Sequence, residues 1–186
     1  MEEWLPGVNL RMSELHAAVA LVQLRRLNSI VRDMRANKSK LKEMVKDDLL
    51  KQSVTFRRIH DSEGDASLAL IFFIPDPART VRVVSALTDE NIPASRLYQD
   101  LQYLPHDHID LHAYPAWVPI LRQRSWSSRG GPWRNHPRSI AYDEGMCPKT
   151  MDLLRRAIHI DVSPDLTLLQ VEQMAEAITK MIRTTL

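Results

Sequence analysis

The amphipathic pattern from Ser13 to about Leu50 constrains this chain most, because it predicts a helix much longer than the usual three or four turns. Apolar residues recur there at intervals of three and four, with arginines and asparagines between them. Ser13 is a suitable N-cap, and the acidic Glu14 suits the positive end of the helix dipole. We expect one long helix with a bend near the polar stretch 37–40, or two helices in series. Such a helix bridges parts of a larger body or lies along an interface.

The periodicity changes after this helix. Residues 54–58 alternate as in a strand, and residues 68–74, LALIFFI, form a continuous apolar run that suits a strand buried on both faces. We then expect a helix at 77–91, a short strand at 93–98 and an irregular proline-rich region at 99–147. A helix at 147–157, a strand at 158–162 and a final amphipathic helix at 163–182 complete the chain.

This order predicts an α+β fold with a small, mainly antiparallel sheet covered by helices. We divide the chain into a motif loop with a linking helix, residues 1–50, and a small α+β domain, residues 51–186.

Composition places the chain among ordinary globular proteins. Its 186 residues carry a net charge of +2, which is too small to indicate a nucleic-acid partner. The single cysteine, Cys147, cannot form a disulfide framework and fits a reducing compartment. No apolar run approaches the roughly 20 residues that span a bilayer, and the acidic start lacks the apolar region of a signal peptide. We therefore expect a cytoplasmic protein with no membrane partner.

Two polar residues, Asn9 and Arg11, stand two positions apart immediately before the long helix. One interpretation is local, since such side chains often satisfy turns and helix ends. The other is anion recognition, because an amide can donate to a phosphate oxygen and a guanidinium can hold a carboxylate by two parallel hydrogen bonds. The residues alone leave both interpretations open.

Three histidines lie close together in the segment HDHIDLH, at His106, His108 and His112. A strand would place two of them on one face, as zinc ligands require, but no cysteine or second histidine pair completes a site. We predict no metal. The Ser-x-x-Lys spacing at residues 39–42 lies in a lysine-rich helix, where we interpret it as a solvated face.

Residues 122–138, RQRSWSSRGGPWRNHPR, combine arginines with two tryptophans, Trp126 and Trp133, and contain no acidic residue. Such a segment can bind single-stranded nucleic acid by charge and stacking. It can equally close over an anionic small molecule, which is the interpretation we favour. The candidate contact residues are Arg129 and Arg134.

The order of the segments resembles the carboxy-terminal part of the DegT/DnrJ/StrS family of sugar aminotransferases. The first stretch, GVNLRMSELHAA, is similar to the family signature Gly-x-Asn-x-Arg-Met-Ser/Thr-Glu-Leu-x-Ala-Ala. The later segments ALTDENIPASRLY, HIDLHAYPAW and CPKTMDLLRRAIHIDV follow in the family's order. The segment around HAYPAW and GGPWR looks closest to members that act on octulosonate-type sugar acids, as in lipopolysaccharide biosynthesis.

The resemblance implies an aspartate-aminotransferase-like fold of type I, with pyridoxal 5'-phosphate as cofactor and glutamate and 2-oxoglutarate as the donor pair. It also implies that the full-length protein is a homodimer and that nucleic acid is not a partner. Asn9 would donate to the cofactor phosphate in the neighbouring subunit's site. Arg11 would hold a glutamate carboxylate with help from His112, and Arg129 and Arg134 would meet the sugar.

The family's large domain, which carries the cofactor lysine, precedes the matching part. The resemblance therefore implies a fragment that has no catalytic residue of its own and is inactive alone. Two alternatives remain: a dehydratase of the same family, and an arginine- and tryptophan-rich module that binds single-stranded nucleic acid.

Overall fold

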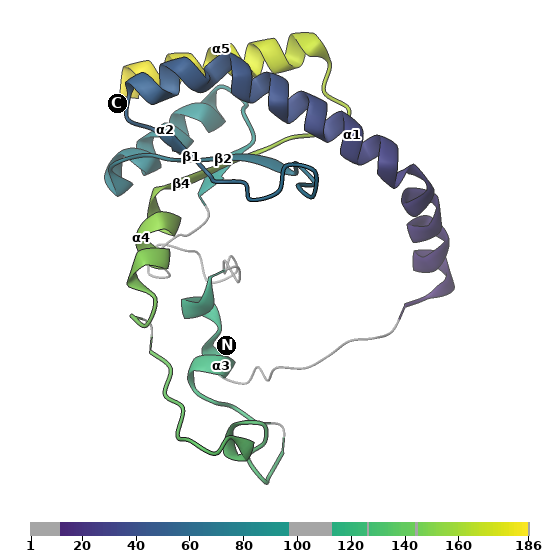
Figure 1. Cartoon of the computed structure of the whole chain (residues 1–186), viewed down its shortest axis with the longest axis vertical. Coiled ribbons are helices and arrows are strands. Elements are labelled where there is room, and N and C mark those ends of the chain that lie inside the picture. The colour runs from purple at the N-terminus through teal and green to yellow at the C-terminus, as the bar shows by residue number, and fades with distance from the viewer. Residues whose placement is uncertain (1–11, 97–112, 126, 144, 186) are drawn as a thin grey trace.

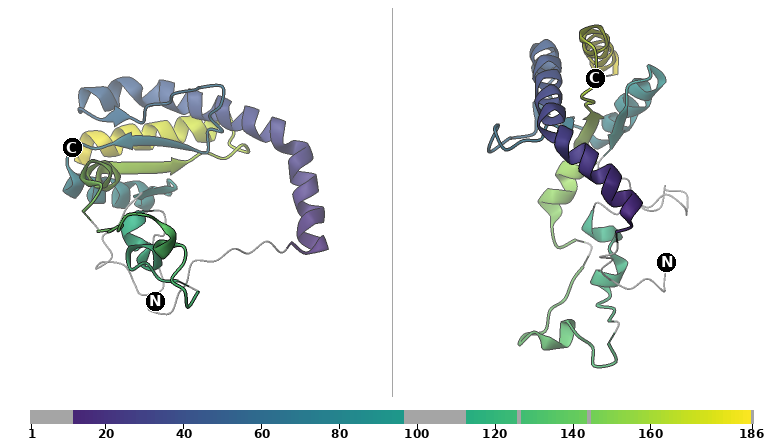
Figure 2. Two further views of the ribbon diagram at one scale, coloured as in Figure 1. Left: turned by 60° about the horizontal axis from the view of Figure 1, so that its bottom comes forward. Right: turned by 90° about the vertical axis from the view of Figure 1, so that its right-hand side faces the viewer.

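The long helix predicted from the sequence is present and continuous. The computed structural model describes residues 12–96, 113–125, 127–143 and 145–185. Helix α1, Glu14–Lys51, contains 38 residues and is capped by Ser13, whose hydroxyl accepts the His16 N–H at 3.2 Å. The stretch 37–40 lies inside this helix, so the chain forms one helix rather than two in series. Its first turns curve away from the other elements, as Figures 1 and 2 show.

A four-stranded antiparallel sheet forms the centre of the molecule. The strands lie in the order β1-β2-β4-β3, and each pairing is antiparallel. Strand β2 is buried on both of its faces over most of its length, as its apolar run predicts. The strand bounds are Thr55–Phe56 for β1, Ala69–Phe73 for β2, Ala94–Arg96 for β3 and Ala157–Asp161 for β4.

Three helices cover one face of the sheet. Helix α5, Leu168–Thr185, lies between the C-terminal part of α1 and helix α2, Pro77–Asp89, as Figure 2 shows. Proline opens α2 because its missing N–H costs nothing at a helix start, and the Asp76 carboxylate accepts the Ala78 N–H at 2.9 Å. The apolar core between sheet and helices includes Leu41, Val45, Leu49, Leu70, Phe72, Val83, Leu87, Ile158, Ile160, Ile178 and Ile182.

The described residues between β3 and β4, from residue 113 onward, form only short elements. They are the 3₁₀ turns Tyr114–Ala116 and Trp133–Asn135, helix α3, Val118–Leu121, and helix α4, Pro148–Arg156. A second, small apolar cluster joins Ala113 to Met151 of α4. The Tyr114 hydroxyl accepts the Cys147 N–H at 3.2 Å, which links the two ends of this region.

The predicted fold class is confirmed: the sheet is small and antiparallel, helices cover it, and a long helix comes first. The division of the chain at residue 50 stays a prediction. The C-terminal part of α1 does contribute Leu41, Val45 and Leu49 to the main core, so this half of the helix is integral to the small domain's packing.

Candidate functional site

The described residues include two of the predicted site residues, Arg129 and Arg134. Asn9, Arg11 and His112 lie outside the described residues, and so do His106 and His108. The site can therefore be built from the arginine-rich segment, residues 122–138, which we call the arginine loop.

Trp133 anchors the arginine loop. Its indole nitrogen donates to the Arg124 carbonyl at 2.9 Å, and its ring meets Tyr142 edge to face with centroids 6.0 Å apart. Aromatic pairs of this geometry stabilise a structure by about 0.5–1.5 kcal/mol beyond their burial. Trp133 thus joins the start of the loop to the segment that follows it.

Two further side chains close the loop internally. The Ser125 hydroxyl donates to the carbonyls of Ser127, at 3.1 Å, and Gly131. The Gln123 amide donates to the Ile140 carbonyl. These hydrogen bonds satisfy backbone carbonyls that have no partner in a β-sheet or helix. The loop therefore has a defined conformation without a strand or a long helix.

Gly130 leaves room for the side chain of Arg134. Its φ of +76° lies in the left-handed region that favours glycine. A Cβ at this position would stand only 2.5 Å from the Arg134 Cδ. The absence of a side chain at residue 130 therefore lets the stem of Arg134 pack against the backbone.

Among the described residues, no carboxylate compensates the positive charge of the loop. None of its arginines forms an ion pair with a carboxylate of the described residues, and Arg129 and Arg134 are exposed. Guanidinium groups without a carboxylate partner are available to bind carboxylate or phosphate by paired hydrogen bonds. The five arginines are Arg122, Arg124, Arg129, Arg134 and Arg138.

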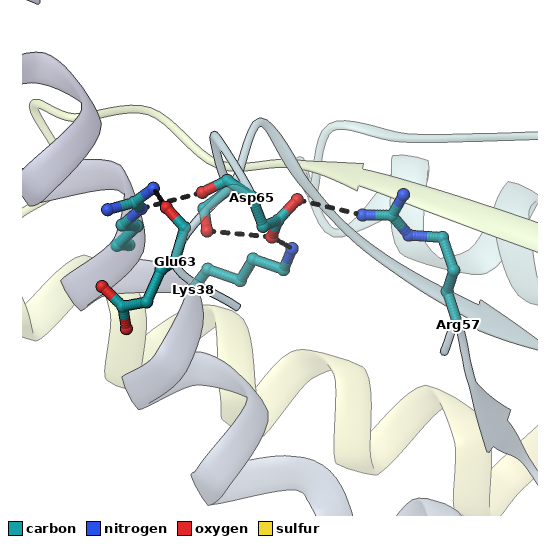
Figure 3. Close-up of polar contacts among 6 residues, drawn as sticks. Lys38, Arg57, Glu63 and Asp65 are labelled. Atoms are coloured by element: carbon teal, nitrogen blue, oxygen red, sulfur yellow. Dashed lines mark hydrogen bonds and ion pairs between the residues drawn. The ribbon is translucent and has the colours of Figure 1, made fainter. Parts of the chain in front are cut away.

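A second polar cluster, which sequence inspection missed, lies between α1 and the loop from β1 to β2. Asp65 accepts from Lys38 at 2.5 Å, from the Ser67 hydroxyl at 3.1 Å and from Arg57 at 3.3 Å. Arg35 donates to the carbonyl of Asp65 at 2.8 Å and to that of Glu63. Figure 3 shows these contacts converging on Asp65.

The cluster around Asp65 is structural. The hydrogen bond from Lys38 is the main cause of a lowered pKa of the Asp65 carboxyl, which favours the ionised form of this group. Its hydrogen bonds attach the loop from β1 to β2 to helix α1. The sequence carries little sign of this cluster, because Asp65 lies in a polar stretch that indicates only a turn.

The Ser-x-x-Lys spacing forms no nucleophilic site. Ser39 is exposed, and the Lys42 nitrogen lies 5.2 Å from the centroid of the Phe56 ring. Over the ranges that the structure describes, no group of three or more histidine, cysteine, aspartate or glutamate residues is placed to hold a metal ion. Over the same ranges, no helix is long and apolar enough to cross a membrane.

The family model of the DegT/DnrJ/EryC1/StrS aminotransferases matches residues 1–114. The chain therefore belongs to this family. The match includes the Asn9 and Arg11 signature and ends at the start of the region that leads to the arginine loop.

Solved structures of aminotransferases share the fold. The chain is similar to Spr1654 from Streptococcus pneumoniae in its PMP form, with a TM-score of 0.62 at 14% identity over 95% of this chain. It is also similar to PseC from Helicobacter pylori, an aminotransferase of pseudoaminic acid biosynthesis, with a TM-score of 0.59 at 14% identity over 96%. For TlmJ from Streptoalloteichus hindustanus the TM-score is 0.60 at 13% identity over 91%. The fold is thus that of part of an aspartate-aminotransferase-like enzyme.

The chain spans little more than a third of each of these proteins: 36% of Spr1654, 39% of PseC and 36% of TlmJ.

Proposed function

We propose that this chain is the carboxy-terminal part of a pyridoxal-phosphate-dependent sugar aminotransferase, which transfers an amino group from glutamate to a keto- or aldehydo-sugar. The observation that carries the proposal is the family match over the signature GVNLRMSELHAA, on a fold shared with sugar aminotransferases. The cofactor supplies an electron sink for the amino-transfer chemistry, and the protein supplies binding and orientation.

In this proposal Asn9 binds the phosphate of the cofactor in the neighbouring subunit of a homodimer. Arg11 holds a carboxylate of glutamate or 2-oxoglutarate, and His112 assists it. The physical basis is the chemistry of the side chains, because an amide donor suits a phosphate oxygen and a guanidinium suits a carboxylate.

The arginine loop then recognises the sugar. Arg129 and Arg134 are exposed, have no carboxylate partner among the described residues and sit on a loop fixed by Trp133. We propose an anionic sugar, with an octulosonate-type sugar acid of lipopolysaccharide synthesis as the specific candidate. We further propose that it acts in the cytoplasm, a reducing compartment to which the single cysteine is suited.

The chain alone is proposed to be inactive, because in the family the cofactor lysine lies in the large domain that precedes the part this chain resembles. A lysine that attacks a carbonyl must lose its proton, so its pKa has to fall. Lys46 and Lys180 have raised pKa values, mainly because Glu43 and Glu90 accept hydrogen bonds from them. Lys38 is buried against Asp65. None of these three amines is prepared for the reaction.

The nucleic-acid alternative has less support. Single-strand binders present exposed aromatic faces on which bases stack. The Trp133 ring instead packs on Tyr142 and holds the loop together through its N–H. A filter-binding assay with single-stranded oligonucleotides checks this point, and salt-dependent retention would favour the alternative.

Absorption spectroscopy tests the proposal for the isolated chain. Pyridoxal phosphate is added in excess, the sample is dialysed, and the spectrum is compared with that of a family enzyme that has its lysine. We expect no retained cofactor band. A band that survives dialysis and is fixed by borohydride would show a competent lysine within this chain and refute its assignment as the lysine-free part.

A further inference from the structure

A hollow of about 510 Å³ lies between the end of α2 and the first turns of α5. Pro93, just before β3, and Asp161, at the end of β4, complete its wall. The arginine loop lies at the opposite end of the molecule, as Figure 1 shows. This hollow is therefore separate from the candidate site for the sugar.

Contacts between the surrounding elements fix the shape of the hollow. The Asp161 N–H donates to the Pro93 carbonyl at 3.3 Å, which joins the end of β4 to the start of β3. The Lys180 ammonium of α5 donates to the Glu90 carboxylate at 2.8 Å, which joins this helix to the end of α2. The hollow is thus formed before any ligand arrives, as is usual for small-molecule sites.

The floor of the hollow is apolar. Ile92 and Met174 are only 7% and 6% exposed, and Leu166 and Ala177 are half-buried beside them. Such a floor takes up the carbon skeleton of a ligand, because contact there removes apolar surface from water. The hollow therefore suits an organic molecule and not a bare ion.

Three carboxamides surround this floor, on Asn91, Gln170 and Gln173. The Gln170 oxygen accepts the Thr167 N–H at 2.8 Å, so the amino end of that carboxamide remains to donate. The side chains of Asn91 and Gln173 form no hydrogen bond with other described residues. A carboxamide both donates and accepts, and so does a hydroxyl group. These side chains therefore suit a ligand with several hydroxyls.

The charge of the hollow is negative, because Glu90 and Asp161 are the charged side chains among the described residues that line it. Glu90 is bound to Lys180. The Asp161 side chain is 69% exposed and has only a long contact, of 3.6 Å, with the His159 ring. Its carboxylate can therefore accept a charge-assisted hydrogen bond from a protonated amine, and it repels a carboxylate or phosphate.

We propose that this hollow binds an amino sugar that carries no acid group. The ammonium of the sugar lies at Asp161, its hydroxyls meet the three carboxamides, and its carbon ring covers the apolar floor. The affinity is expected to be millimolar, because the ligand is small and the hollow is open to water. The proposal does not depend on the proposed aminotransferase reaction.

Titration of the whole chain with D-glucosamine, followed through the backbone amide signals in NMR, tests this binding. The signals of residues 90–93, 161–163 and 170–177 should shift together and saturate. D-glucose lacks the ammonium, so it should bind about tenfold more weakly or less. Cyclohexylamine lacks the hydroxyls and should also bind more weakly. Equal affinity for glucosamine and cyclohexylamine would show a site for cations alone and overturn the proposal.

A substitution at Asp161 tests the place of the ammonium. Asp161→Asn should weaken the binding of glucosamine about tenfold or more, and should leave that of glucose within about twofold, because only the charge is lost. The matched control is Asp47→Asn, which removes an exposed carboxylate of α1 that does not line the hollow. It should leave both affinities unchanged.

The amide spectrum shows whether each variant keeps the fold. In folded variants, an equal loss of glucosamine affinity for Asp161→Asn and Asp47→Asn would overturn the proposal. Non-saturating shifts with glucosamine in the unmodified chain would overturn it as well.

Discussion

The ammonium of Lys38 and the carboxylate of Asp65 are 2.5 Å apart, and their side chains are only 7% and 17% exposed. Lys38 lies in the middle of α1, and Asp65 lies 27 residues further along the chain in the loop from β1 to β2. This pair, with Arg35 and Arg57, attaches the loop to the part of the helix that enters the core. The counter-charge explains how the Lys38 ammonium can be buried without the large free-energy cost of an unpaired charge.

Asp65→Asn should therefore destabilise the protein, because it leaves the buried Lys38 without its counter-charge. We expect a loss of about 2–4 kcal/mol in the free energy of unfolding, somewhat below the range for a fully buried pair. Urea denaturation followed by circular dichroism measures this value. The control is Asp33→Asn, whose partner Arg32 is 72% exposed and whose change should stay within about 0.5 kcal/mol. A similar small effect at Asp65 would contradict the role given to the pair.

The same carboxyl predicts a dependence of stability on pH. Hydrogen bonding from Lys38 lowers the pKa of Asp65 below its ordinary value of 3.8 in the folded state. The folded state thus binds this proton less readily than the unfolded state, so the stabilisation is present above pH 3.8 and is lost as pH falls through the folded-state pKa. The difference in the free energy of unfolding between the unmodified protein and Asp65→Asn should become smaller below this pH. If this difference in free energy stays constant on acidification, the destabilisation by Asp65→Asn comes from altered packing and not from the lost charge.

Gly130→Ala should disturb the arginine loop at Arg134. An alanine would adopt a left-handed φ and would meet the Arg134 stem, so we expect a local cost of about 1–3 kcal/mol. Hydrogen exchange of residues 123–140 should rise while exchange in β2 and β4 stays unchanged, because the loop lies outside the main core. Adding Arg134→Ala, which removes the Cγ, Cδ and Nε atoms of that stem, relieves the collision but not the backbone strain, so it should recover only part of the protection. Full recovery would show that the conformation of Gly130 is unimportant.

In an active enzyme that contains this chain, Arg129→Gln and Arg134→Gln should each raise the KM for an anionic sugar about tenfold or more. Each removes a charge-assisted contact, for which about 1.5–3 kcal/mol is typical. The KM for glutamate should not change, which separates the arginine loop from the donor site. Arg32→Gln, on the exposed side of α1, serves as the control and should leave both constants unaltered. Equal effects of all three variants would argue against recognition by the loop.

The sequence allowed most elements of this fold to be predicted, because their apolar patterns are strong. The run LALIFFI predicted β2, and the N-cap at Ser13 and the proline at 77 predicted where α1 and α2 begin. The strand order was beyond prediction, since an apolar pattern indicates which face is buried but not which strand is the neighbour. The Lys38–Asp65 pair was beyond prediction for a related reason: each residue alone looks like an exposed charge, and only the fold brings them together.

The candidate site was predictable only in part. Composition identified the arginine loop, because arginines without nearby carboxylates are visible in the sequence. The role of Trp133 was not visible, since a tryptophan in such a segment suggests stacking on a ligand, whereas here it bonds to Arg124 and packs on Tyr142.

Glutamate-dependent amino transfer is the most direct test of the central claim. The chain is joined behind a family large domain that carries the cofactor lysine, and the formation of 2-oxoglutarate from glutamate is measured with and without Arg11→Ala. We expect activity in the fusion, and a rise of about 10–100-fold in the KM for glutamate with Arg11→Ala, as the loss of a bidentate charged contact predicts. An unchanged KM for glutamate, in a fusion that folds and binds the cofactor, would contradict the account.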